Sequence, residues 1–534
     1  MTSKPDRYSK YDSDISLIMA NNNTTSRLII QMQQPDFYPH AVVEDLKLVQ
    51  THASYVFLTG NYAYKVKKNV NYGFLDYSSL TKRKFFLDEE LRLNRKIAPE
   101  LYLEVLPISQ HDSKFVLANS ANIVEYALKM HAFPQENLFS NLLETDQLSS
   151  DRLTELGKIV AKFHQNADTN EYISKFGTAA NIRVAFAENY QQSQKYVEKV
   201  QTREQLEATK VYTDYFFTER EYLLKQRVKQ GKIKECHGDL HLNNICLWHK
   251  QIQLFDRLEF NESFRFVDTM YDIAFIVMDL EARKKPDLAN IFLNSYLEYT
   301  GDWTGLLVLP LYLSRQAYVR AKVNSFLLDD PQVSEDKKQQ ARKTAREYYQ
   351  LAYQYTQTKS GSLILMSGLS GSGKSTVART IAQNKGAIQI RSDAVRKHLA
   401  GIPVDQVDQS ASDRLYTAAM TQKTYDRLLE LGLILVKEGY TVILDAKYDR
   451  LSLRQAVITQ AKEQNILLKI IYCTAPESVL RDRLNQRQND ISDATADLIS
   501  TQQATIEDFT TRERDYVTTI DTAQANWSEK LSNI

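Results

Sequence analysis

The sequence has few cysteines and no long hydrophobic run, and these absences exclude whole classes of protein. Three cysteines in 534 residues cannot form a disulfide framework, and no CxxC pair or Cys/His cluster predicts a zinc site. The longest apolar runs, at 273–278 and 306–313, are far shorter than the roughly 18 residues of a membrane helix. The first residues, MTSKPDRYSKYDSDIS, are polar where a signal peptide carries an apolar segment. We therefore expect a cytoplasmic protein that does not associate with membranes.

An excess of charge of one sign is also missing. The chain has 67 Lys and Arg residues against 66 Asp and Glu, a net charge of +1. Proteins that coat nucleic acids or bind anionic membranes usually carry a basic excess, so this balance argues against both and leaves room only for a local basic pocket. The 43% apolar and 25% charged residues are ordinary for folded proteins and exclude general disorder. At about 150 residues per domain, the length predicts three to four compact units.

The order of the predicted elements divides the chain into two different halves. Residues 1–30 are polar and are expected to form a flexible tail. Two β-rich runs at 54–60 and 63–68, separated by a Gly-Asn turn, predict a hairpin, and 78–97 has the start signal and periodicity of a helix. Mostly helical patterns follow. From residue 358 onward, short apolar strands alternate with helical segments, which is typical of a parallel α/β sheet.

A phosphate-binding motif opens this second half. GLSGSGKST at 368–376 matches G-x-x-x-x-G-K-[ST] between a predicted strand and a predicted helix. The alternative is a flexible Gly/Ser turn, and the strand and helix on either side argue against it. The glycines allow N–H groups to turn towards phosphate oxygens, and the helix N-terminus adds its dipole. The lysine supplies charge to the β- and γ-phosphates, and the serine hydroxyl serves magnesium. The predicted ATP-binding residues are Gly368, Gly371, Ser372, Gly373, Lys374, Ser375 and Thr376, with Ser375 also a magnesium ligand.

Charged residues at the ends of neighbouring strands suit phosphoryl transfer. Asp445 ends a predicted buried strand, where a carboxylate can hold magnesium; capping a helix is the alternative. Asp393 and Arg396 lie three apart at the start of a helix after the second strand. The Asp can accept a proton from a substrate hydroxyl and the Arg can hold the substrate, unless they are a capping Asp and a surface Arg.

The arginines after the fourth strand are candidates for a phosphate clamp. Among Arg481, Arg483 and Arg487, the last two lie four apart on one helical face and suit a mobile lid, with solvated side chains as the alternative. Together the motifs over about 362–520 resemble small P-loop kinases of the gluconate-kinase, zeta-toxin and polynucleotide-kinase type. In those families an Asp-x-x-Arg after the second strand contacts the phosphate acceptor. The resemblance implies this role for Asp393 and Arg396, with a plain ATPase as the alternative.

The first half contains a second candidate site in HGDLHLNNICLWHKQIQLFD at 237–256. Asp239 precedes Asn244 by five residues, as in the catalytic loop of kinases, and Asp256 ends a strand two short elements later. In that pattern the first Asp orients and deprotonates the acceptor hydroxyl, while the Asn and the second Asp hold magnesium at the nucleotide phosphates. We predict these roles for the three residues. The histidines of the segment are expected to brace and pack the loop.

A kinase-like fold also needs a phosphate-binding lysine and an acidic partner upstream. Lys65, on the second strand of the predicted hairpin, is the candidate, with Lys67 on the same face as the alternative. The predicted helix supplies Glu90, or its neighbour Glu89, for the ion pair. These residues complete a nucleotide site in the first half.

Two further positions extend this site. The segment IVEYALKM at 123–130 looks like an interlobe hinge, where backbone groups of Glu125 and Ala127 are expected to receive adenine. Glu259, three residues after Asp256, lies either near the metal or on the surface. Sequence spacing does not decide between the two positions of Glu259.

One departure from protein kinases indicates the family. No G-x-G-x-x-G precedes the lysine, and only LTGN is found at 58–61. This favours a resemblance to the aminoglycoside phosphotransferase-like branch, which lacks that loop and which the segments at 156–168 and 264–281 also resemble. In that branch Asp272 is expected to serve structure and helix capping rather than catalysis.

Over nearly its whole length the chain resembles the bacterial bifunctional aminoglycoside phosphotransferase/ATP-binding proteins. The resemblance implies a fold of the α/β and α+β classes with two domains. Residues 31–357 form the bilobal, protein-kinase-like domain, and 358–534 form the P-loop NTPase domain with a parallel sheet. The name does not establish an aminoglycoside substrate, because no acid cluster suited to a polycation is found outside the catalytic residues.

The predicted function is that of an ATP- and Mg²⁺-dependent phosphotransferase with two nucleotide sites. The expected acceptors are hydroxyl groups of small metabolites that resemble sugars, amino sugars or sugar acids. Arg315 and Lys322, on one face of a helix, favour an anionic acceptor if they line its cleft and are otherwise surface charges. The alternatives are a nucleic-acid end kinase, disfavoured by the neutral net charge, and an ATP-binding regulatory protein, disfavoured by the two complete residue sets.

Overall fold

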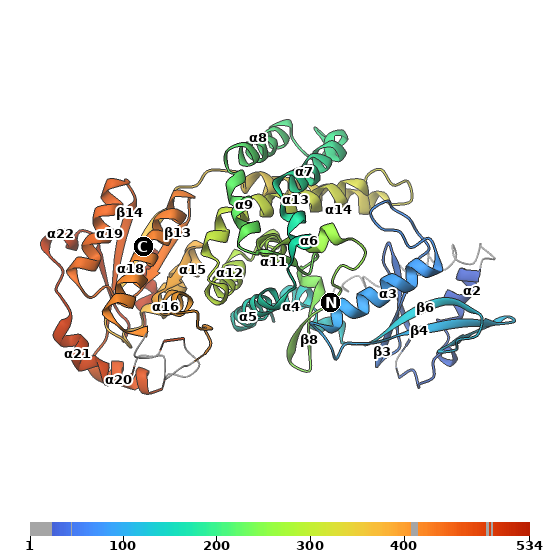
Figure 1. The fold of residues 1–534 in the computed structure, drawn as a ribbon, viewed down its shortest axis with the longest axis horizontal. Coiled ribbons are helices and arrows are strands. Elements are labelled where there is room, and N and C mark those ends of the chain that lie inside the picture. The colour runs from blue at the N-terminus through green and yellow to red at the C-terminus, as the bar shows by residue number, and fades with distance from the viewer. Residues whose placement is uncertain (1–23, 44, 407–414, 487–490, 493–494, 534) are drawn as a thin grey trace, which may run out of the picture. The chain divides into compact units, whose positions relative to one another are not determined.

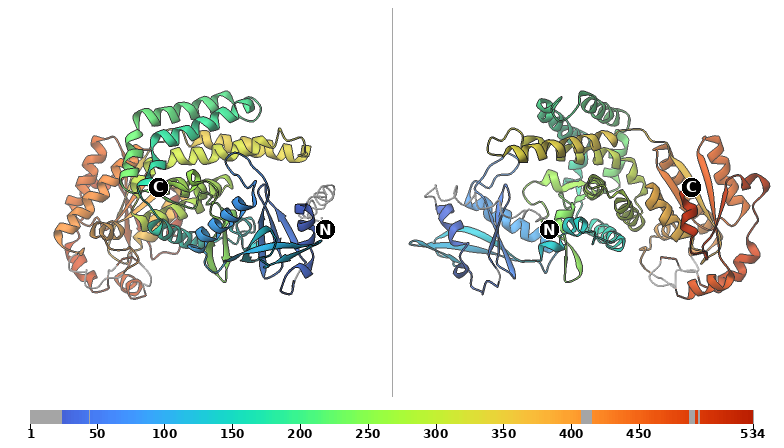
Figure 2. Two further views of the ribbon diagram at one scale, coloured as in Figure 1. Left: turned by 45° about the vertical axis from the view of Figure 1, so that its right-hand side comes forward. Right: turned by 180° about the vertical axis from the view of Figure 1, so that it is seen from behind.

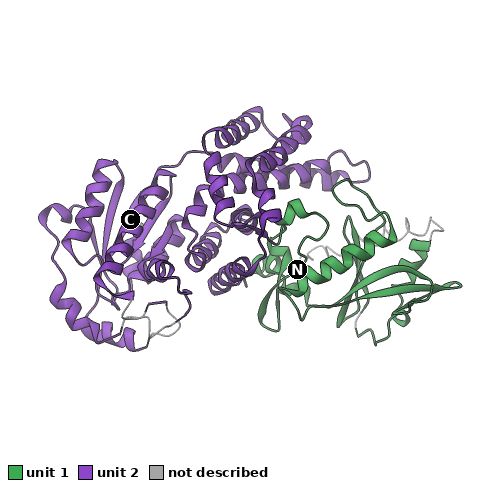
Figure 3. Cartoon of the chain, viewed as in Figure 1, with its two compact units in different colours: residues 1–145, 237–265 green, residues 146–236, 266–534 purple. Residues whose placement is uncertain are grey.

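The computed structural model describes residues 24–43, 45–406, 415–486, 491–492 and 495–533. The chain forms two compact units (Figure 3). The first contains residues 1–145 and 237–265, and the second contains 146–236 and 266–534. The first unit is therefore built from two separate stretches of sequence. None of the described helices has both the length and the apolar composition needed to cross a membrane.

An antiparallel sheet of six strands forms the frame of the first unit (Figure 1). The predicted hairpin is present as β2 and β3, and the predicted helix is present as α3, which packs on β4 and β6. The strands, in sheet order, are β1 (Lys47–Gln50), β2 (Ser54–Leu58), β3 (Tyr62–Lys67), β6 (Ile123–His131), β4 (Tyr102–His111) and β5 (Lys114–Leu117), with α2 (Thr24–Gln31) and α3 (Leu80–Arg95) as the helices before β4.

Helix α3 begins and packs as its sequence dictates. The hydroxyl of Ser79 accepts a hydrogen bond from the backbone N–H of Lys82 and so caps the helix. Leu87 is fully buried in a core that also contains Tyr102 and Cys246. The face of α3 that packs on the sheet thereby reaches the segment after residue 237.

That later segment of the first unit is short and compact. The turn η5 (Leu242–Asn244) leads into the hairpin of β8 (Ile245–Trp248) and β9 (Gln251–Leu254). Helix α4 (Phe139–Glu144) packs on the turn and on β8, and α10 (Glu262–Arg265) ends the segment. The loops before and after this hairpin carry the residues of the first candidate site.

The helical part of the second unit is organised in packed pairs. Helix α12 packs on α5, and α13 packs along α14. Figure 2 shows the helical part from two further sides. Strands β7 and β10 form a two-stranded antiparallel sheet, and β10 leads directly into α11. The elements are α5 (Ser150–Asn166), α6 (Glu171–Ser174), α7 (Ala179–Ser193), α8 (Arg203–Glu219), α9 (Glu221–Lys229), β7 (Ile233–Glu235), β10 (Phe266–Asp268), α11 (Thr269–Ala282), α12 (Pro286–Thr300), α13 (Leu309–Phe326) and α14 (Glu335–Gln354).

The rest of the second unit is a five-stranded parallel sheet in the order β12-β13-β11-β14-β15. Residues of α15 pack with Ile364 of β11 and Ile443 of β13 in one core. Gly432 of α18 instead lies against Leu363 and Leu444, the neighbouring residues of the same two strands. Because successive strand residues point to opposite faces, helices cover both faces. The elements are β11 (Ser362–Ser367), α15 (Lys374–Lys385), β12 (Ile388–Arg391), α16 (Ser392–Ala400), α18 (Ala418–Lys437), β13 (Thr441–Asp445), α19 (Leu451–Glu463), β14 (Leu467–Thr474), α20 (Glu477–Asn485), α21 (Leu498–Thr505), α22 (Thr511–Arg514) and β15 (Val517–Asp521).

The predicted fold class is confirmed: a kinase-like first part is followed by a parallel sheet with a phosphate loop. The predicted boundary at 357–358 lies between α14 and β11, inside the second compact unit. Part of the expected tail is ordered, since residues 24–30 belong to helix α2. Leu28 and Ile29 are buried against the six-stranded sheet, which gives this polar-looking segment an apolar face.

Candidate active sites

In the first unit, a lysine on β3 faces an acid on α3. Lys65 Nζ lies 2.7 Å from Glu90 Oε1 and 2.7 Å from Asp256 Oδ1. The Glu90 side chain is 0% exposed and that of Lys65 is 12% exposed. Burial lowers the pKa of Lys65, but the two carboxylates outweigh it and raise the pKa well above its usual value. Glu89, the alternative acid, instead pairs with Arg92 on the outer side of the helix.

Lys67 takes a different place from Lys65. Its Nζ lies 2.5 Å from Glu90 Oε2 and 2.5 Å from Glu259 Oε1. Tyr77 donates a short hydrogen bond to the same Glu259 oxygen, and burial together with this carboxylate raises the pKa of Tyr77. Glu259 is 5% exposed, so it does not lie on the surface. Lys67 and Glu259 form a buried ionic layer that shares Glu90 with the site.

The loop before β8 brings Asp239 and Asn244 together. Asn244 Nδ2 donates hydrogen bonds to the Asp239 backbone oxygen at 2.9 Å and to its carboxylate Oδ2 at 3.1 Å. His241 Nε2 lies 3.4 Å from the same carboxylate oxygen. His237 Nε2 pairs with the backbone oxygen of Phe255 at 3.0 Å, across to the end of the hairpin. These contacts agree with a bracing role for His237, and they place His241 beside the Asp239 carboxylate.

Asp256 adopts a backbone conformation that is uncommon for residues other than glycine. Its φ is 61°, in the left-handed region, and its N–H donates a 2.9 Å hydrogen bond to the hydroxyl of Tyr102. Such strained positions persist where surrounding contacts hold them, and they cluster at functional sites. Here the conformation turns the carboxylate back towards Lys65.

The two carboxylates of this site are both held in the ionised form. Burial raises the pKa of Asp239, but His241 outweighs it and the pKa lies below its ordinary value. Burial likewise raises the pKa of Asp256, and Lys65 more than reverses the effect. Their side chains remain 33% and 44% exposed respectively, so both can be reached by a ligand. An ionised pair of oxygen-bearing groups beside a lysine suits a metal-bound polyphosphate.

The segment expected to receive adenine forms strand β6, in which Glu125 and Ala127 pair with Ile108 and Leu106 of β4. Their contact with adenine stays a prediction. The Glu125 carboxylate also accepts a hydrogen bond from Arg83 Nε at 2.9 Å. Strand β6 continues to His131, one residue beyond the segment singled out in the sequence.

The glycines of the phosphate loop meet close neighbours. Gly368 has a φ of 132°, and a Cβ there would lie 2.3 Å from the backbone oxygen of Cys473. Gly371 has a φ of 80°, and a Cβ there would lie 2.7 Å from the backbone oxygen of Leu480. No L-residue with a side chain fits either position without movement. The loop therefore needs glycine for both conformation and space.

The residues predicted to bind phosphate and magnesium lie around this loop. Lys374 and Ser375 begin α15, and Lys374 Nζ donates to the backbone oxygen of Leu369 at 2.7 Å. Burial lowers the pKa of Lys374. Asp445 is the last residue of β13, is 4% exposed, and accepts a 2.8 Å hydrogen bond from Gln389 Nε2. It caps no helix, since α19 begins at residue 451.

Asp393 and Arg396 open helix α16 as predicted. No side chain caps this helix, so Asp393 does not serve as the cap. Burial raises the pKa of Asp393, although nearby Arg391 opposes the rise. Arg396 is 6% exposed and its Nη1 donates to the backbone oxygen of Leu415 at 2.8 Å, so it is not a surface arginine. The alternative of a capping Asp393 and a surface Arg396 is therefore wrong.

The three clamp candidates take different places. Arg483 Nη1 donates to the backbone oxygen of Gly371 at 3.3 Å and to Thr522 Oγ1 at 2.8 Å. Arg481 pairs with Glu477 at 2.8 Å on its own helix. Arg487 lies outside the residues that the structure describes. Of the two candidates that the structure describes, Arg483 is the one placed at the phosphate loop.

Several residues around the second site were not anticipated from the sequence. Gln389 reaches Asp445, Arg391 Nε lies 4.0 Å from the same carboxylate, and Thr522 Oγ1 donates to the backbone oxygen of Ser372 at 2.9 Å. Polar side chains in a four-residue buried strand were the available signal for Gln389 and Arg391. Nothing local in the sequence indicates Thr522.

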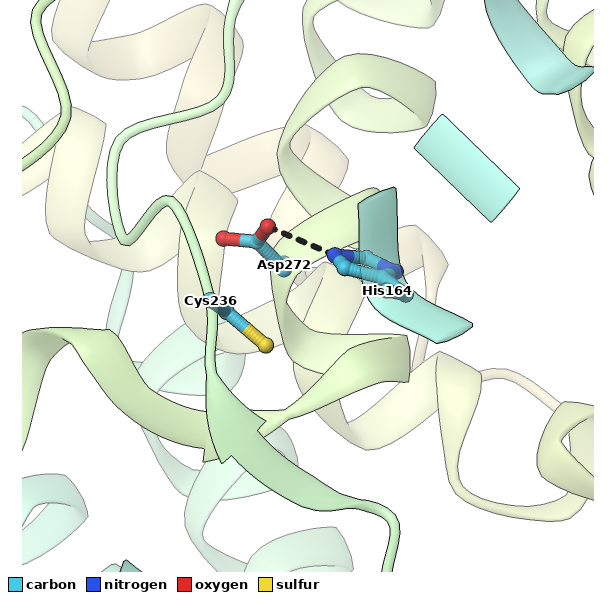
Figure 4. Close-up of side chains that lie close together, drawn as sticks. All are labelled: His164, Cys236 and Asp272. Carbon is cyan, nitrogen blue, oxygen red and sulfur yellow. Dashed lines mark hydrogen bonds and ion pairs between the residues drawn. The ribbon is translucent and has the colours of Figure 1, made fainter. Parts of the chain in front are cut away.

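A buried cluster in the helical part is structural in character (Figure 4). His164, Cys236 and Asp272 have ligand atoms within 4.8 Å of one another. His164 Nε2 lies 2.9 Å from Asp272 Oδ2, and its Nδ1 lies 2.9 Å from Tyr296 Oη. Both ring nitrogens are therefore engaged by protein groups, which leaves neither for a metal ion. Asp272 joins two helices, and the N-cap of α11 is Asp268.

The basic face expected on α13 is engaged by neighbouring helices. Lys322 Nζ donates to Asn189 Oδ1 and to Gln192 Oε1, both at 2.7 Å. The Arg315 guanidinium lies 4.7 Å from the ring centre of Tyr271. Burial, with a smaller contribution from Arg315, lowers the pKa of Lys322 to about 8. These contacts give the two residues packing roles within the helical part.

A protein-family model matches the part of the chain that contains the phosphate loop. Residues 363–509 match the family model described as an AAA domain. Two curated relatives match almost the full chain: uncharacterized proteins of Mycobacterium tuberculosis (strain H37Rv) and Mycobacterium bovis are each 28% identical over 489 residues, which cover 91% of this chain and 94% of the relative. The predicted resemblance to a P-loop protein is thus confirmed for the second half.

Solved structures align with the two parts separately. A gluconokinase from Sinorhizobium meliloti is 24% identical, with a TM-score of 0.23, and covers 33% of this chain and 94% of that one. A choline/ethanolamine kinase family protein from Mesorhizobium loti is 9% identical, with a TM-score of 0.37, and covers 62% and 99%.

Proposed function

We propose that this chain is an ATP-dependent kinase with two separate nucleotide sites, each of which transfers the γ-phosphate of ATP to a hydroxyl group of a small metabolite. The observation that carries the proposal is the assembly of a full set of phosphoryl-transfer groups at each site. In the first unit these are Lys65, Glu90, Asp239, Asn244 and Asp256. In the second unit they are the phosphate loop with Asp393 and Asp445.

Both sites contain groups that fit magnesium. Asn244 directs its amide nitrogen to Asp239, which turns its amide oxygen away from that residue, and Asp256 presents an ionised carboxylate. In the second unit, the hydroxyl of Ser375 and the carboxylate of Asp445 are the corresponding oxygen donors. Hard oxygen ligands of this kind, together with nucleotide phosphates, are what magnesium prefers in kinases. When bound, the ion neutralises charge on the β- and γ-phosphates.

At the first site the protein residues divide the work of transfer. Lys65, fixed by Glu90, binds the nucleotide phosphates. Asp239 accepts the proton of the acceptor hydroxyl as the oxygen–phosphorus bond forms and the bond from the γ-phosphorus to the bridging oxygen breaks. ADP leaves with the electron pair of that bond. The ionised state of Asp239 is the state that this step requires.

At the second site, backbone N–H groups of the loop and Lys374 bind the phosphates. Asp393 accepts the proton of the acceptor hydroxyl, and Arg396 orients the acceptor. Arg483, which contacts the loop backbone, is close enough to contribute charge to the transferring phosphoryl group. The raised pKa of Asp393 makes it a stronger base than an exposed aspartate.

The test is ADP release that depends on magnesium and on an added acceptor. The panel contains sugars, amino sugars, sugar acids, nucleosides and oligonucleotides. We expect stimulation by one or more small hydroxylated metabolites. Stimulation by oligonucleotides alone would identify a nucleic-acid end kinase, and ATP binding without stimulation by any acceptor would identify a regulatory protein.

A further inference from the structure

Helix α12 closes the free edge of the parallel sheet. Strand β12 is the edge strand, and its neighbour on the open side is a helix rather than another strand. Asn290 Nδ2 and Asn294 Nδ2 donate to the backbone oxygen of Ala387 at 2.9 and 3.0 Å. The backbone N–H of Gln389 donates to Asn294 Oδ1 at 2.8 Å. Two amides, four apart on α12, thus replace the hydrogen bonds of a missing strand.

The side chains of β12 connect this helix to the second candidate site. Gln389 donates to Asp445, the predicted magnesium ligand. Arg391 Nη1 lies 3.6 Å from Glu298 Oε2 of α12, and its Nε lies 4.0 Å from Asp445 Oδ2. Arg391 therefore lies between a carboxylate of the helical part and a carboxylate of the phosphate-loop site.

A pocket of about 140 Å³ lies at this junction. Its charged lining comes from four elements: Lys158 of α5, Glu298 of α12, Arg379 of α15 and Arg391 of β12. Three cations thus face one carboxylate, and that carboxylate already lies beside Arg391. The lining therefore has a positive excess that suits an anionic ligand. A volume of about 150 Å³ holds a ligand of roughly the size of benzene, so this pocket admits a small group rather than a polymer.

The lining of the pocket includes residues that adjoin the proposed acceptor position at Asp393. Arg391 lines it and is the charged group that most strongly opposes the rise in the pKa of Asp393. Ile491 also lines it, and the next residue, Ser492, hydrogen-bonds the Asp393 side chain. Arg391 and the segment 491–492 thus connect the lining of the pocket with the surroundings of Asp393.

We propose that this pocket is an acceptor subsite of the second kinase site, built jointly by the P-loop part and by helices α5 and α12, and that it binds an anionic group of the acceptor. The proposal rests on the proposed kinase function of that site. A carboxylate and a phosphate ester share the required chemistry: a compact anion that accepts charge-assisted hydrogen bonds from Arg379, Arg391 and Lys158. Lys158 and Glu298 lie outside residues 363–509, so part of the specificity of the second site resides in the first half of the sequence.

The test uses the full chain with Asp239→Asn, which silences the first site, and pairs of acceptors that differ in charge. D-gluconate is compared with D-glucitol, and D-glucose 6-phosphate with D-glucose, in assays of ADP release. We expect turnover of the anionic member of at least one pair with a KM at least 10-fold below that of its neutral partner, a difference that one charge-assisted interaction supplies. The pair that shows the difference distinguishes a carboxylate from a phosphate ester.

Lys158 provides the sharper part of the test because it lies on α5. Lys158→Gln is expected to raise the KM for the anionic acceptor about 10-fold with little change in kcat, and Lys158→Arg is expected to restore it. The matched control is Arg427→Gln, which removes an exposed cation that pairs with Glu430 on α18 and does not line the pocket. A general loss of stability would lower kcat or the melting temperature and would not distinguish anionic from neutral acceptors.

Two results would overturn the inference. One is equal use of neutral and anionic acceptors, or use of neutral ones alone, in a reaction that Lys374→Ala abolishes; the proposed kinase function would then stand without the subsite. The other is an unchanged KM for the anionic acceptor in Lys158→Gln. If no acceptor of any charge stimulates ADP release, the kinase function fails and the inference fails with it.

Discussion

Lys65 and Asp256, which lie 191 residues apart in the sequence, form a 2.7 Å ion pair in the first compact unit. Glu90 binds the same ammonium group from the helix on the other side. The left-handed backbone of Asp256 directs its carboxylate to this point. Lys65 and the predicted magnesium ligand Asp256 are thus held together by contacts within the protein alone. Phosphoryl transfer requires preorganisation of this kind.

We predict that Lys65→Met disables the first site without unfolding the protein. The lysine supplies the charge for the nucleotide phosphates, so its loss is expected to lower kcat/KM at this site by at least about 100-fold. Steady-state ADP release in a Lys374→Ala background measures the first site alone. An activity within a few-fold of the parent would show that Lys65 does not bind the phosphates.

Lys67→Met is the matched comparison and is expected to act through stability. Lys67 is 3% exposed and lies between Glu90 and Glu259, so its removal leaves the buried carboxylate of Glu259 without this cation, while Glu90 keeps Lys65. Breaking a buried ionic group in this way costs about 3–5 kcal/mol. Chemical denaturation monitored by circular dichroism should therefore separate the two variants. Equal stability of Lys67→Met and the parent protein would contradict the buried layer.

The two sites are expected to respond differently to pH. Each general base must be ionised, so activity falls as pH drops through its pKa. At Asp393 burial raises the pKa, whereas at Asp239 the burial effect is outweighed by His241 and the pKa is lowered. The acidic limb of kcat/KM should accordingly lie at higher pH for the second site than for the first. Profiles of Asp239→Asn and Lys374→Ala chains isolate the two reactions, and the reverse order of the limbs would contradict the assignment.

Gly368→Ala should abolish nucleotide binding at the second site. An alanine Cβ would lie 2.3 Å from the backbone oxygen of Cys473, so the phosphate loop must move. Gly386→Ala is the control: it also has a positive φ, of 64°, but nothing lies within 4 Å of the added atom. We expect the control to lose about 1–2 kcal/mol of stability, which is the cost of a left-handed backbone for alanine, and to keep its affinity for ATP, as measured by calorimetry in the Asp239→Asn, Lys65→Met background. Retained ATP binding in Gly368→Ala would contradict the role of the loop.

Local spacing was enough to predict much of both sites. The residues of the phosphate loop lie only a few positions apart in the sequence, and so do Asp239 and Asn244. In each case the motif alone is enough to predict that its residues lie together. The choice of Glu90 over Glu89 and the separate place of Lys67 needed the packing of α3 on the sheet. Spacing alone leaves adjacent residues of a helix, or alternate residues of a strand, as equal candidates.

The parts that the sequence does not report depend on distant contacts. Glu125 and Ala127 were expected at a hinge, and the structure places them inside a strand that pairs with β4 and continues to residue 131. The contacts of Glu298 with Arg391 and of Asn294 with Gln389 join two regions that sequence patterns treat as separate domains. No periodicity or motif reports such an interface.

The most direct test of two independent kinase sites is ADP release by four full-length chains: the parent, Asp239→Asn, Lys374→Ala and the double variant. Each is assayed with magnesium, ATP and the acceptor panel. The two-site account predicts that each single variant loses turnover with one set of acceptors and keeps the other, while the double variant retains neither. Loss of all turnover and all ATP binding in Lys374→Ala alone would show that the site of Lys65 and Asp239 is not a kinase site.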